Sequence, residues 1–354
     1  MVAVEVKKIA VWSPSFDSAS GGIQAVSEDV VWACRTAAPT DARELSRRGE
    51  PTLYEKLSFL AGCGFSCVVN GPGNVLAMHV AFLPPAAILK RVFRFRLAVW
   101  LHGIEAWESP PGLHGRCLDA VDLFIASSSV TRERSRGWRP EGVPCEVVHP
   151  TTDFQVFSPG PKNPDLLRRY GFDDGDEIIL TVGRLAPGEA YKGHDAVIRV
   201  LPAVLQSRPR AKYLVVGEGG DRSRLEGIAR QAGLGSRVVF AGHVASSELP
   251  DHYRLAEVFA MPSAGEGFGI SYLEALGCGC RVVAGSGDGA AEALCGGTLG
   301  ALVDPGDRAG LGGALTDGLA RGRNELLPER VEEIFGRDRF RRELLACLRS
   351  IQDA

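Results

Sequence analysis

The stretch Val258–Gly277, "VFAMPSAGEGFGISYLEALG", joins a strand-like run, a turn rich in glycine and an apolar helix. Four large apolar side chains recur in it at helical spacing: Phe268, Tyr272, Leu273 and Leu276. Apolar side chains at this spacing predict a helix that packs one face onto a sheet. Gly277 follows the last of them, so we expect it to end the helix as a left-handed C-cap.

The same succession of strand and helix repeats along the whole chain. Unbroken apolar runs rich in β-branched residues are typical of parallel strands that are buried on both faces. Such runs predict strands at 8–12, 67–70, 97–102, 123–127 and 145–150, and then at 178–184, 211–217, 237–242, 258–263, 281–285 and 300–304. Two series of this kind predict an α/β fold of two doubly wound domains, with parallel sheets and crossover helices. The loop-like segment 157–165 is the expected linker.

Bulk composition limits the function. The 354 residues suit two domains, and the 40 Lys and Arg against 43 Asp and Glu give no reason to expect nucleic acid as a partner. The nine cysteines are scattered without CxxC pairs, which favours free thiols in a reducing cytosol and no metal site. The N-terminus lacks a signal-peptide pattern, and the apolar run 75–89 is interrupted by prolines and too short to span a membrane. We therefore expect a cytoplasmic protein.

A pair of cations follows the strand at 178–184. In "VGRLAPGEAYKGHD" (182–195), Arg184 ends the strand and Lys192 comes just before the next expected helix. A guanidinium and an ammonium near a helix N-terminus make a good anion site. The alternative, an exposed Arg and Lys that only solvate the surface, remains open at this level.

Two further glycine turns are ambiguous. In "LVVGEGGDRSRLEGIA" (214–229), Arg222 occupies the place of the third glycine of a dinucleotide-binding GxGxxG motif. "GSGDGA" (285–290) fits a GxGxxA variant, with Asp304 as a late acidic partner. A nucleotide site and ordinary structural turns both explain such glycines.

Two glutamates, Glu266 and Glu274, distinguish the turn between strand and helix in the opening stretch. Without side chains at Gly267 and Gly269, the N–H groups of the first helical turn are open to a diphosphate. Carboxylates do not bind phosphate, but they accept hydrogen bonds from vicinal hydroxyls. A sugar nucleotide offers hydroxyls on both sides of its diphosphate. The alternative is that Glu266 is a loop charge and Glu274 an exposed helix residue.

The second half of the chain resembles the retaining GT-B glycosyltransferases of the GT4-like group. "EGFGISYLE" is similar to their E-x7-E motif, from Glu266 to Glu274. Other blocks follow in the family's order: "VGRL…YKGHD", "VVGEGGDRSRLEGIA", "VVFAGHV…ELPDHYRLAEVFAMPS" and "GALVDPGD". The first half is more weakly similar, through "GGIQ" (21–24), "WLHGIEAW" (100–107), "LFIASS" (123–128) and "HPTTDFQVFSP" (149–159).

The resemblance implies a GT-B fold of two Rossmann-like domains facing across a cleft. The acceptor-side domain would comprise residues 1–155 and a crossover helix at about 336–354, and the donor-binding domain residues 166–335. Hinge closure would then occur around 155–165. In three respects the chain departs from the family: a longer Arg-to-Lys spacing, Glu257 in place of Asp, and a short first domain.

The resemblance also implies roles for individual residues. Arg184 and Lys192 would bind the donor diphosphate and offset the charge on the departing nucleotide, and Glu274 would hold the ribose hydroxyls. Glu266 would hold sugar hydroxyls and phosphate, and His102 would reach the donor sugar from the first domain. The remaining donor-binding positions implied by the matching blocks are Gly21, Gly22, Gly217, Glu218, Val244 and the backbone at Phe268, Gly269 and Ile270.

The implied reaction is transfer from a UDP- or GDP-linked sugar to a hydroxyl acceptor, in polysaccharide, glycolipid or secondary-metabolite assembly. It would retain the anomeric configuration, with the leaving phosphate oxygen taking the acceptor proton. No metal or other cofactor is expected, because the cations would fill that role. The acceptor would be a saccharide, a lipid-linked saccharide or a small molecule.

The basic segment "LKRVFRFRLAVW" (89–100) leaves a membrane contact open. As an amphipathic surface helix it could lie on anionic lipid, and the alternative is a solvated face that leads into a strand. Three other function classes also remain: an NAD-dependent oxidoreductase, a sugar-nucleotide epimerase, and a binding module without activity.

Overall fold

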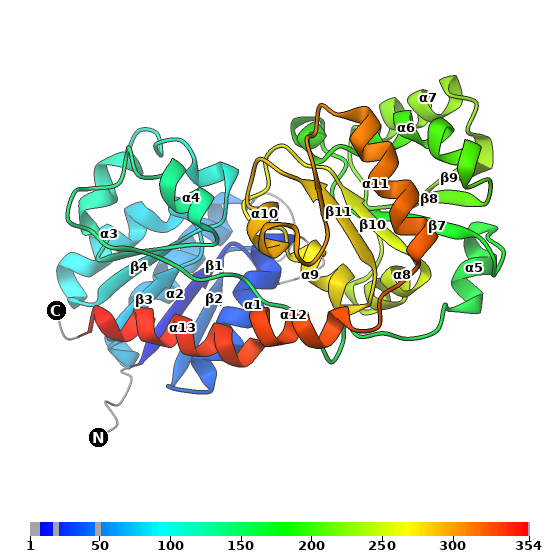
Figure 1. The fold of residues 1–354 in the computed structure, drawn as a ribbon. Helices are drawn as coiled ribbons and strands as arrows, with labels where there is room; N and C mark the ends of the chain where they lie inside the picture. Colours follow the sequence, from blue (N-terminus) through cyan, green and yellow to red (C-terminus); the bar gives the residue numbers. More distant parts are fainter. Residues whose placement is uncertain (1–7, 17–20, 47–50, 353–354) are drawn as a thin grey trace. The chain divides into compact units, whose positions relative to one another are not determined.

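The computed structural model describes residues 8–16, 21–46 and 51–352. They form two compact units: the described residues up to 151 together with 337–352, and residues 152–336. Each unit contains a six-stranded sheet in which every pair of neighbouring strands is parallel, with helices connecting successive strands (Figure 1). The α/β class with two doubly wound sheets is confirmed.

The first unit has the strand order β2-β1-β3-β4-β5-β6. Its strands are β1 (Ile9–Ser13), β2 (Thr40–Glu44), β3 (Asn74–Ala77), β4 (Arg96–Leu101), β5 (Leu123–Ala126) and β6 (Cys145–Val147). Its helices are α1 (Gly22–Arg35), α2 (Leu53–Asn70), α3 (Leu83–Phe93), α4 (Ser129–Arg134) and α13 (Arg337–Ser350). The buried face of α2 and the neighbouring α3 pack onto one apolar cluster with β1, β3, β4 and β5.

The strand predicted at 67–70 is wrong, because these residues form the last turn of α2. A capping box between Thr52 and Glu55 begins this helix, and Gly71, in the left-handed conformation, ends it. The actual strand, β3, starts at Asn74. The sequence reading also missed β2, whose residues "TDARE" are polar because the strand lies at the edge of the sheet.

The segment 89–100 is not one surface helix. α3 ends at Phe93, Arg94 adopts the left-handed conformation, Phe95 is buried, and β4 follows. Two of the cations on this segment are also engaged inside the unit. Lys90 Nζ lies 2.5 Å from the Asp122 carboxylate and Arg96 lies 3.3 Å from it. The predicted basic face therefore loses half of its free charge.

The second unit has the strand order β12-β11-β10-β7-β8-β9. Its strands are β7 (Glu177–Val182), β8 (Ala211–Val216), β9 (Val238–Gly242), β10 (Val258–Met261), β11 (Arg281–Gly285) and β12 (Ala301–Val303). Its helices are α5 (Pro164–Tyr170), α6 (His194–Ser207), α7 (Arg222–Gln231), α8 (Leu249–Leu255), α9 (Ile270–Gly277), α10 (Ala290–Ala293), α11 (Arg308–Arg321) and α12 (Leu327–Phe335). Apolar clusters fill both faces of this sheet.

The strand order of the second unit contains a topological switch. From β7 the chain builds outward through β8 to β9, and then returns to add β10 on the other side of β7. In open parallel sheets the loops diverge at such a point and leave a crevice beyond the carboxyl ends of the strands. The cation segment after β7 and the glycine turn after β10 both start there.

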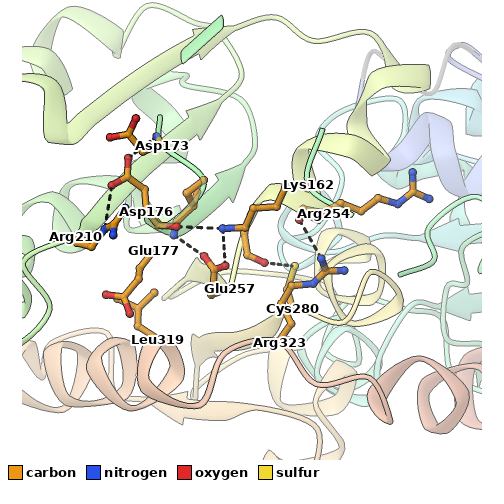
Figure 2. Close-up of polar contacts among 12 residues, drawn as sticks. Lys162, Asp173, Asp176, Glu177, Arg210, Arg254, Glu257, Cys280, Leu319 and Arg323 are labelled. Carbon is orange, nitrogen blue, oxygen red and sulfur yellow. Dashed lines mark hydrogen bonds and ion pairs between the residues drawn. The ribbon is translucent and has the colours of Figure 1, made fainter. Parts of the chain in front are cut away.

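The segment 157–165, predicted as the linker, is bound to the second unit. Lys162 lies 2.7 Å from the Glu257 carboxylate, and Arg323 donates to the Gly160 carbonyl oxygen at 2.8 Å. Arg254 donates to the Ser158 carbonyl oxygen at 2.9 Å. Figure 2 shows Lys162 between Glu257 and the loop that precedes β7. The chain passes between the units instead at 151/152 and 336/337.

The last helix, α13, belongs to the first unit. Its first residue, Arg337, lies 2.8 Å from the Asp29 carboxylate of α1. Phe340 is buried against Trp100, and the Leu348 carbonyl oxygen accepts a hydrogen bond from Asn74 at 3.2 Å. The end of the chain therefore returns to the sheet on which the chain began.

Candidate active site

The cation segment and the glycine turn meet at the switch of the second unit. Lys192 ends a 3₁₀ turn (Pro187–Lys192) after β7, and its Nζ lies 2.8 Å from Glu266 Oε1 in the turn after β10. The backbone joins the same segments, since the Ala264 N–H donates to the Tyr191 carbonyl oxygen at 2.9 Å. Residues distant in sequence thus form one charged site.

The two cations differ in exposure. The side chain of Lys192 is 15% exposed, whereas that of Arg184 is 69% exposed. Burial opposes the charged form of Lys192, but the carboxylates of Glu266 and Glu189 outweigh it and raise the lysine pKa above its usual value. Lys192 is therefore an ammonium held by Glu266, with its charged form favoured, and Arg184 is a guanidinium that can reach a ligand from the surface.

Glu189 is a site residue that the sequence reading missed. One of its carboxylate oxygens pairs with Arg184. The other lies 3.8 Å from Lys192 Nζ and is buried without a hydrogen bond. Its position in the sequence between Arg184 and Lys192 could have indicated a role in the site. Only the 3₁₀ turn, however, brings its carboxylate close to both cations.

Asp288 is a second missed residue, and it fixes the glycine turn. Its carboxylate accepts hydrogen bonds from the Glu266 N–H at 2.6 Å and the Ala290 N–H at 2.9 Å. Burial raises the pKa of Asp288. The Gly289 N–H donates in turn to the Glu266 carbonyl oxygen at 2.9 Å. Hydrogen bonds of the Glu266 backbone with Asp288 and Gly289 thus fix this residue in place, and its side-chain carboxylate contacts Lys192.

The helix after the glycine turn, α9, begins without a side-chain cap. Its N-cap is Gly269, with φ of 89°, and a Cβ at this position would lie 2.4 Å from the ring of Tyr272. Phe268, just before it, is buried, and Ile270 starts the helix. The first-turn N–H groups and the helix dipole suit an anion at this end.

Glu274 lies within α9, and its carboxylate is oriented from behind. The hydroxyl of Tyr253, which is fully buried, donates to Glu274 Oε2 at 2.6 Å. The sequence analysis did not identify this tyrosine. A carboxylate fixed in this way is suited to accept hydrogen bonds from a diol.

The expected C-cap at Gly277 is wrong. Gly277 is the last residue of α9, Cys278 follows as the C-cap with a φ of −80°, and Gly279 is the residue with positive φ. A Cβ on Gly277 would lie 2.6 Å from the Phe157 carbonyl oxygen. Gly277 therefore serves close packing. The four apolar residues predicted to pack α9 onto the sheet are all buried, as expected.

The other glycine turns have structural explanations. Cβ atoms on Gly217 and Gly219 would lie 2.0 and 2.3 Å from the carbonyl oxygens of Gly183 and Leu185. These glycines let the turn after β8 lie against the loop that carries Arg184. A Cβ on Gly285 would likewise lie 1.8 Å from the Ser263 carbonyl oxygen. The packing reading is thus favoured over a dinucleotide fingerprint.

Two more predicted donor positions lie near these turns. Glu218 has an exposed side chain, and its carbonyl oxygen accepts a hydrogen bond from the Leu185 N–H at 2.9 Å. Val244 is 8% exposed and belongs to the apolar cluster under the sheet, so its side chain supports the site from within the core.

In the first unit, His102 follows β4 and is held in one tautomer. Its Nε2–H donates to the Met78 carbonyl oxygen at 2.8 Å, and its backbone N–H donates to the Glu105 carboxylate at 2.7 Å. Burial lowers the pKa of His102 to about 4, so the ring is neutral near pH 7 and Nδ1 is an acceptor. Gly21 is the N-cap of α1, Gly22 is its first residue, and residues 17–20 lie outside the described part.

All nine cysteines are free thiols, as expected. Among the residues that the structure describes, no group of three His, Cys, Asp or Glu side chains could hold a metal ion. Within the same residues, no helix combines the length and apolarity that crossing a membrane requires.

Comparison with known proteins assigns the family. Residues 163–327 match the profile of the glycosyl transferases group 1. A GDP-mannose-dependent alpha-(1-6)-phosphatidylinositol monomannoside mannosyltransferase of Mycolicibacterium smegmatis is 34% identical over 284 residues, which cover 77% of this chain and 72% of that protein. The chain belongs to this glycosyltransferase family. The Mycobacterium tuberculosis protein of the same name is 33% identical over 64% of this chain and 61% of its own length.

Solved glycosyltransferase structures share the fold. A sucrose-phosphate synthase from Thermosynechococcus elongatus superposes with a TM-score of 0.80 at 20% identity, covering 98% of this chain and 99% of that one. The Anabaena protein HepE, in complex with UDP-glucose, gives a TM-score of 0.78 at 20% identity over 98% of this chain and 100% of its own. The two-domain GT-B fold expected from the resemblance is thus confirmed.

For this glycosyltransferase, the structure brings together Lys192, Glu266, Arg184 and Glu189 at one strand switch, and α9 begins four residues after Glu266. Family membership favours glycosyl transfer over the oxidoreductase and epimerase alternatives.

Proposed function

We propose that the protein transfers a hexose from a nucleoside-diphosphate sugar to an acceptor hydroxyl, with retention of configuration and without a metal ion. The observation that carries this proposal is the Lys192–Glu266 pair at the switch of the second sheet, next to the uncapped start of α9. A buried ammonium and a helix N-terminus suit the diphosphate, and the two glutamates suit hydroxyls on either side of it.

The donor is UDP- or GDP-linked in this proposal. Relatives named as GDP-mannose-dependent mannosyltransferases make GDP-mannose the first donor to test. Those names also refer to phosphatidylinositol mannosides, and another relative, from Kineococcus radiotolerans, is named a D-inositol 3-phosphate glycosyltransferase. The acceptor class we propose is therefore a hydroxyl of an inositol-containing or lipid-linked saccharide.

In the proposed reaction the anomeric C–O bond to the diphosphate breaks, and a bond forms to the acceptor oxygen on the same face of the sugar. The acceptor proton passes to the departing phosphate oxygen, so no separate base is consumed. Negative charge grows on the leaving diphosphate, where Lys192, Arg184 and the N–H groups of α9 would stabilise it. Neutral His102 would accept a hydrogen bond from a sugar hydroxyl through Nδ1.

The first test is which nucleoside diphosphate raises the melting temperature, since ligands that bind only the folded state stabilise it. We expect GDP or UDP to do so, and Glu274→Ala to lose much of the shift through the lost ribose contact. Turnover should persist in a chelator. Activity that disappears with the chelator and returns only with a divalent metal would contradict the leaving-group assignment, as would a product of inverted configuration.

A further inference from the structure

Helix α2 of the first unit presents an apolar surface to solvent. Leu53, Leu57, Phe65 and Val68 are 72, 57, 67 and 69% exposed. Side chains at this spacing lie on one face of a helix. Three further residues of α2 are large, apolar and exposed: Tyr54, Leu60 and Val69. So many on one helix amounts to a patch, because exposed apolar residues are ordinarily scattered singly.

The opposite face of α2 is buried in the ordinary way. Phe59, Cys63 and Cys67 pack into the apolar cluster of the first sheet. The inward face therefore accounts for the folding of α2, and the outward face is apolar beyond what folding requires. A helix that is apolar on both faces belongs between two apolar layers.

Helix α3 extends the same surface. Ile88 and Val92, one helical turn apart, are 64 and 68% exposed. α2 and α3 are neighbours, and a Cβ on Gly64 of α2 would lie in van der Waals contact with Leu89 of α3. We call the outward side chains of these two helices the α2/α3 face: Leu53, Tyr54, Leu57, Leu60, Phe65, Val68, Val69, Ile88 and Val92.

Positive charge predominates on the two helices of the α2/α3 face. Glu55 is the only acidic residue of the two helices, and its carboxylate is occupied by Thr52 and Ser46. Lys56, Arg91 and Arg94 beside the face are exposed, and none of them forms an ion pair within the described part of the chain. Apolar side chains bordered by free cations complement an apolar layer bordered by anionic groups.

We propose that the α2/α3 face docks on an anionic lipid bilayer, with its apolar side chains at the headgroup–acyl boundary and the three cations on lipid phosphates. Interfacial helices with this division of apolar and basic residues bind membranes in that orientation. A symmetric dimer through the same face would bring like charges together, because both copies contribute the same residues. The use of this surface rests on the proposed function, since an enzyme acting on a lipid-linked acceptor works at the bilayer.

The test is co-sedimentation of the full chain with vesicles of phosphatidylcholine and phosphatidylserine in equal amounts, and with vesicles of phosphatidylcholine alone. We expect binding to the anionic vesicles at low salt, at least tenfold weaker binding to the neutral vesicles, and loss at high salt. The double variant Leu57→Gln/Phe65→Gln should bind at least tenfold more weakly, and Arg91→Gln/Arg94→Gln should lose the preference for anionic lipid.

The matched control is Leu326→Gln in the second unit, because Leu326 is also highly exposed, at 76%, but lies outside the face. It should bind vesicles like the parent protein. Circular dichroism would show that each variant keeps its melting temperature, as expected for outward positions.

Two results would overturn the proposal. One is absence of vesicle binding at low salt. The other is that the parent protein is a dimer in solution and that Leu57→Gln/Phe65→Gln converts it to a monomer without changing its binding to vesicles. Transfer to a water-soluble acceptor separates this inference from the proposed function. If transfer persists without lipid binding, the surface assignment fails alone, and if binding occurs without any transfer, the enzymatic proposal fails.

Discussion

Replacing Lys192 by Gln should lower kcat by more than the accompanying loss of folding stability can explain. The chain contains a matched control, the ion pair between Lys162 and Glu257. Lys192 and Glu266 are 15 and 13% exposed, with the charged atoms 2.8 Å apart. Lys162 and Glu257 are both 16% exposed, with a separation of 2.7 Å. Both pairs lie in the second unit, but Lys162 anchors the segment before β7 (Figure 2) and lies away from the strand switch.

The expected loss of stability is similar for the two variants. Removing one partner of a fully buried ion pair costs about 3–5 kcal/mol because the other charge is left unpaired, and we expect about 2–3 kcal/mol of lost unfolding free energy here because both pairs are partly exposed. The loss is moderated in both, because Glu257 keeps a hydrogen bond from the Ile178 N–H and the loop of Glu266 keeps its bonds to Asp288.

The expected loss of activity differs. Removing one preorganised group that stabilises developing negative charge costs about 3–4 kcal/mol, or roughly 10²–10³-fold in kcat. Lys192→Gln should show this loss, and Lys192→Arg should recover part of it because the charge is kept. Lys162→Gln should keep kcat within about threefold of the parent, once the folded fraction is taken into account.

The assay combines urea unfolding with release of the nucleoside diphosphate from the donor identified by thermal shift. Equal stability loss with unequal kcat supports the assignment of Lys192 to the leaving group. If both variants lost kcat in proportion to stability, or if Lys192→Gln turned over like the parent, the charge of Lys192 would have no catalytic role.

Three further predictions follow from single side chains. Glu189→Gln should lower the Kd for the nucleoside diphosphate about 5- to 30-fold, because the repulsion between a carboxylate and a nearby bound anion is worth about 1–2 kcal/mol. Calorimetry would measure this change, and unchanged or weaker binding would show that Glu189 chiefly holds Arg184. Burial, and secondarily Lys192, lowers the pKa of His194 to about 4, which is below its pKa in the unfolded chain. The neutral ring of His194 therefore contributes its full stability above about pH 6.5, and this contribution is lost as the pH falls toward 4. His194→Asn should flatten that part of the urea-midpoint profile, and a parallel profile would contradict the assignment. Arg94→Gly should raise the free energy of unfolding by about 1 kcal/mol, because Arg94 caps α3 with φ of 52°, and a lower urea midpoint would refute that account.

The local structure around Glu266 was predictable because the pattern that specifies it lies within one short segment of the sequence. The strand, the glycine turn and the helix around Glu266 are contiguous, so periodicity and glycine spacing identify them without tertiary information. The contact between Lys192 and this turn depends on β7 and β10 being neighbouring parallel strands. A doubly wound pattern is consistent with that strand order but does not determine it.

The errors arose where a helix-start signal was overlooked or where a contact comes from a distant segment. Val68 and Val69 are β-branched and predict a strand, but the capping box at Thr52 starts a helix that continues through them. The strand prediction assumed that β-branched residues in an apolar run are buried, but Val68 and Val69 are exposed. Tyr253 and Asp288 were missed for a different reason, since each supports a glutamate through a single hydrogen bond from another segment.

The arrangement of Glu189 and Glu266 around the two cations suggests how one site can bind a diphosphate and still release it. Without nucleotide, two carboxylates balance Arg184 and Lys192, so burial of the ammonium is compensated locally. In the proposed reaction a diphosphate would have to compete with these carboxylates for the same cations, and this competition would weaken the binding of donor and product alike. Charge on the leaving oxygen grows as the anomeric bond breaks and is complete in the released diphosphate, so competition from the two carboxylates would limit how tightly the product is retained.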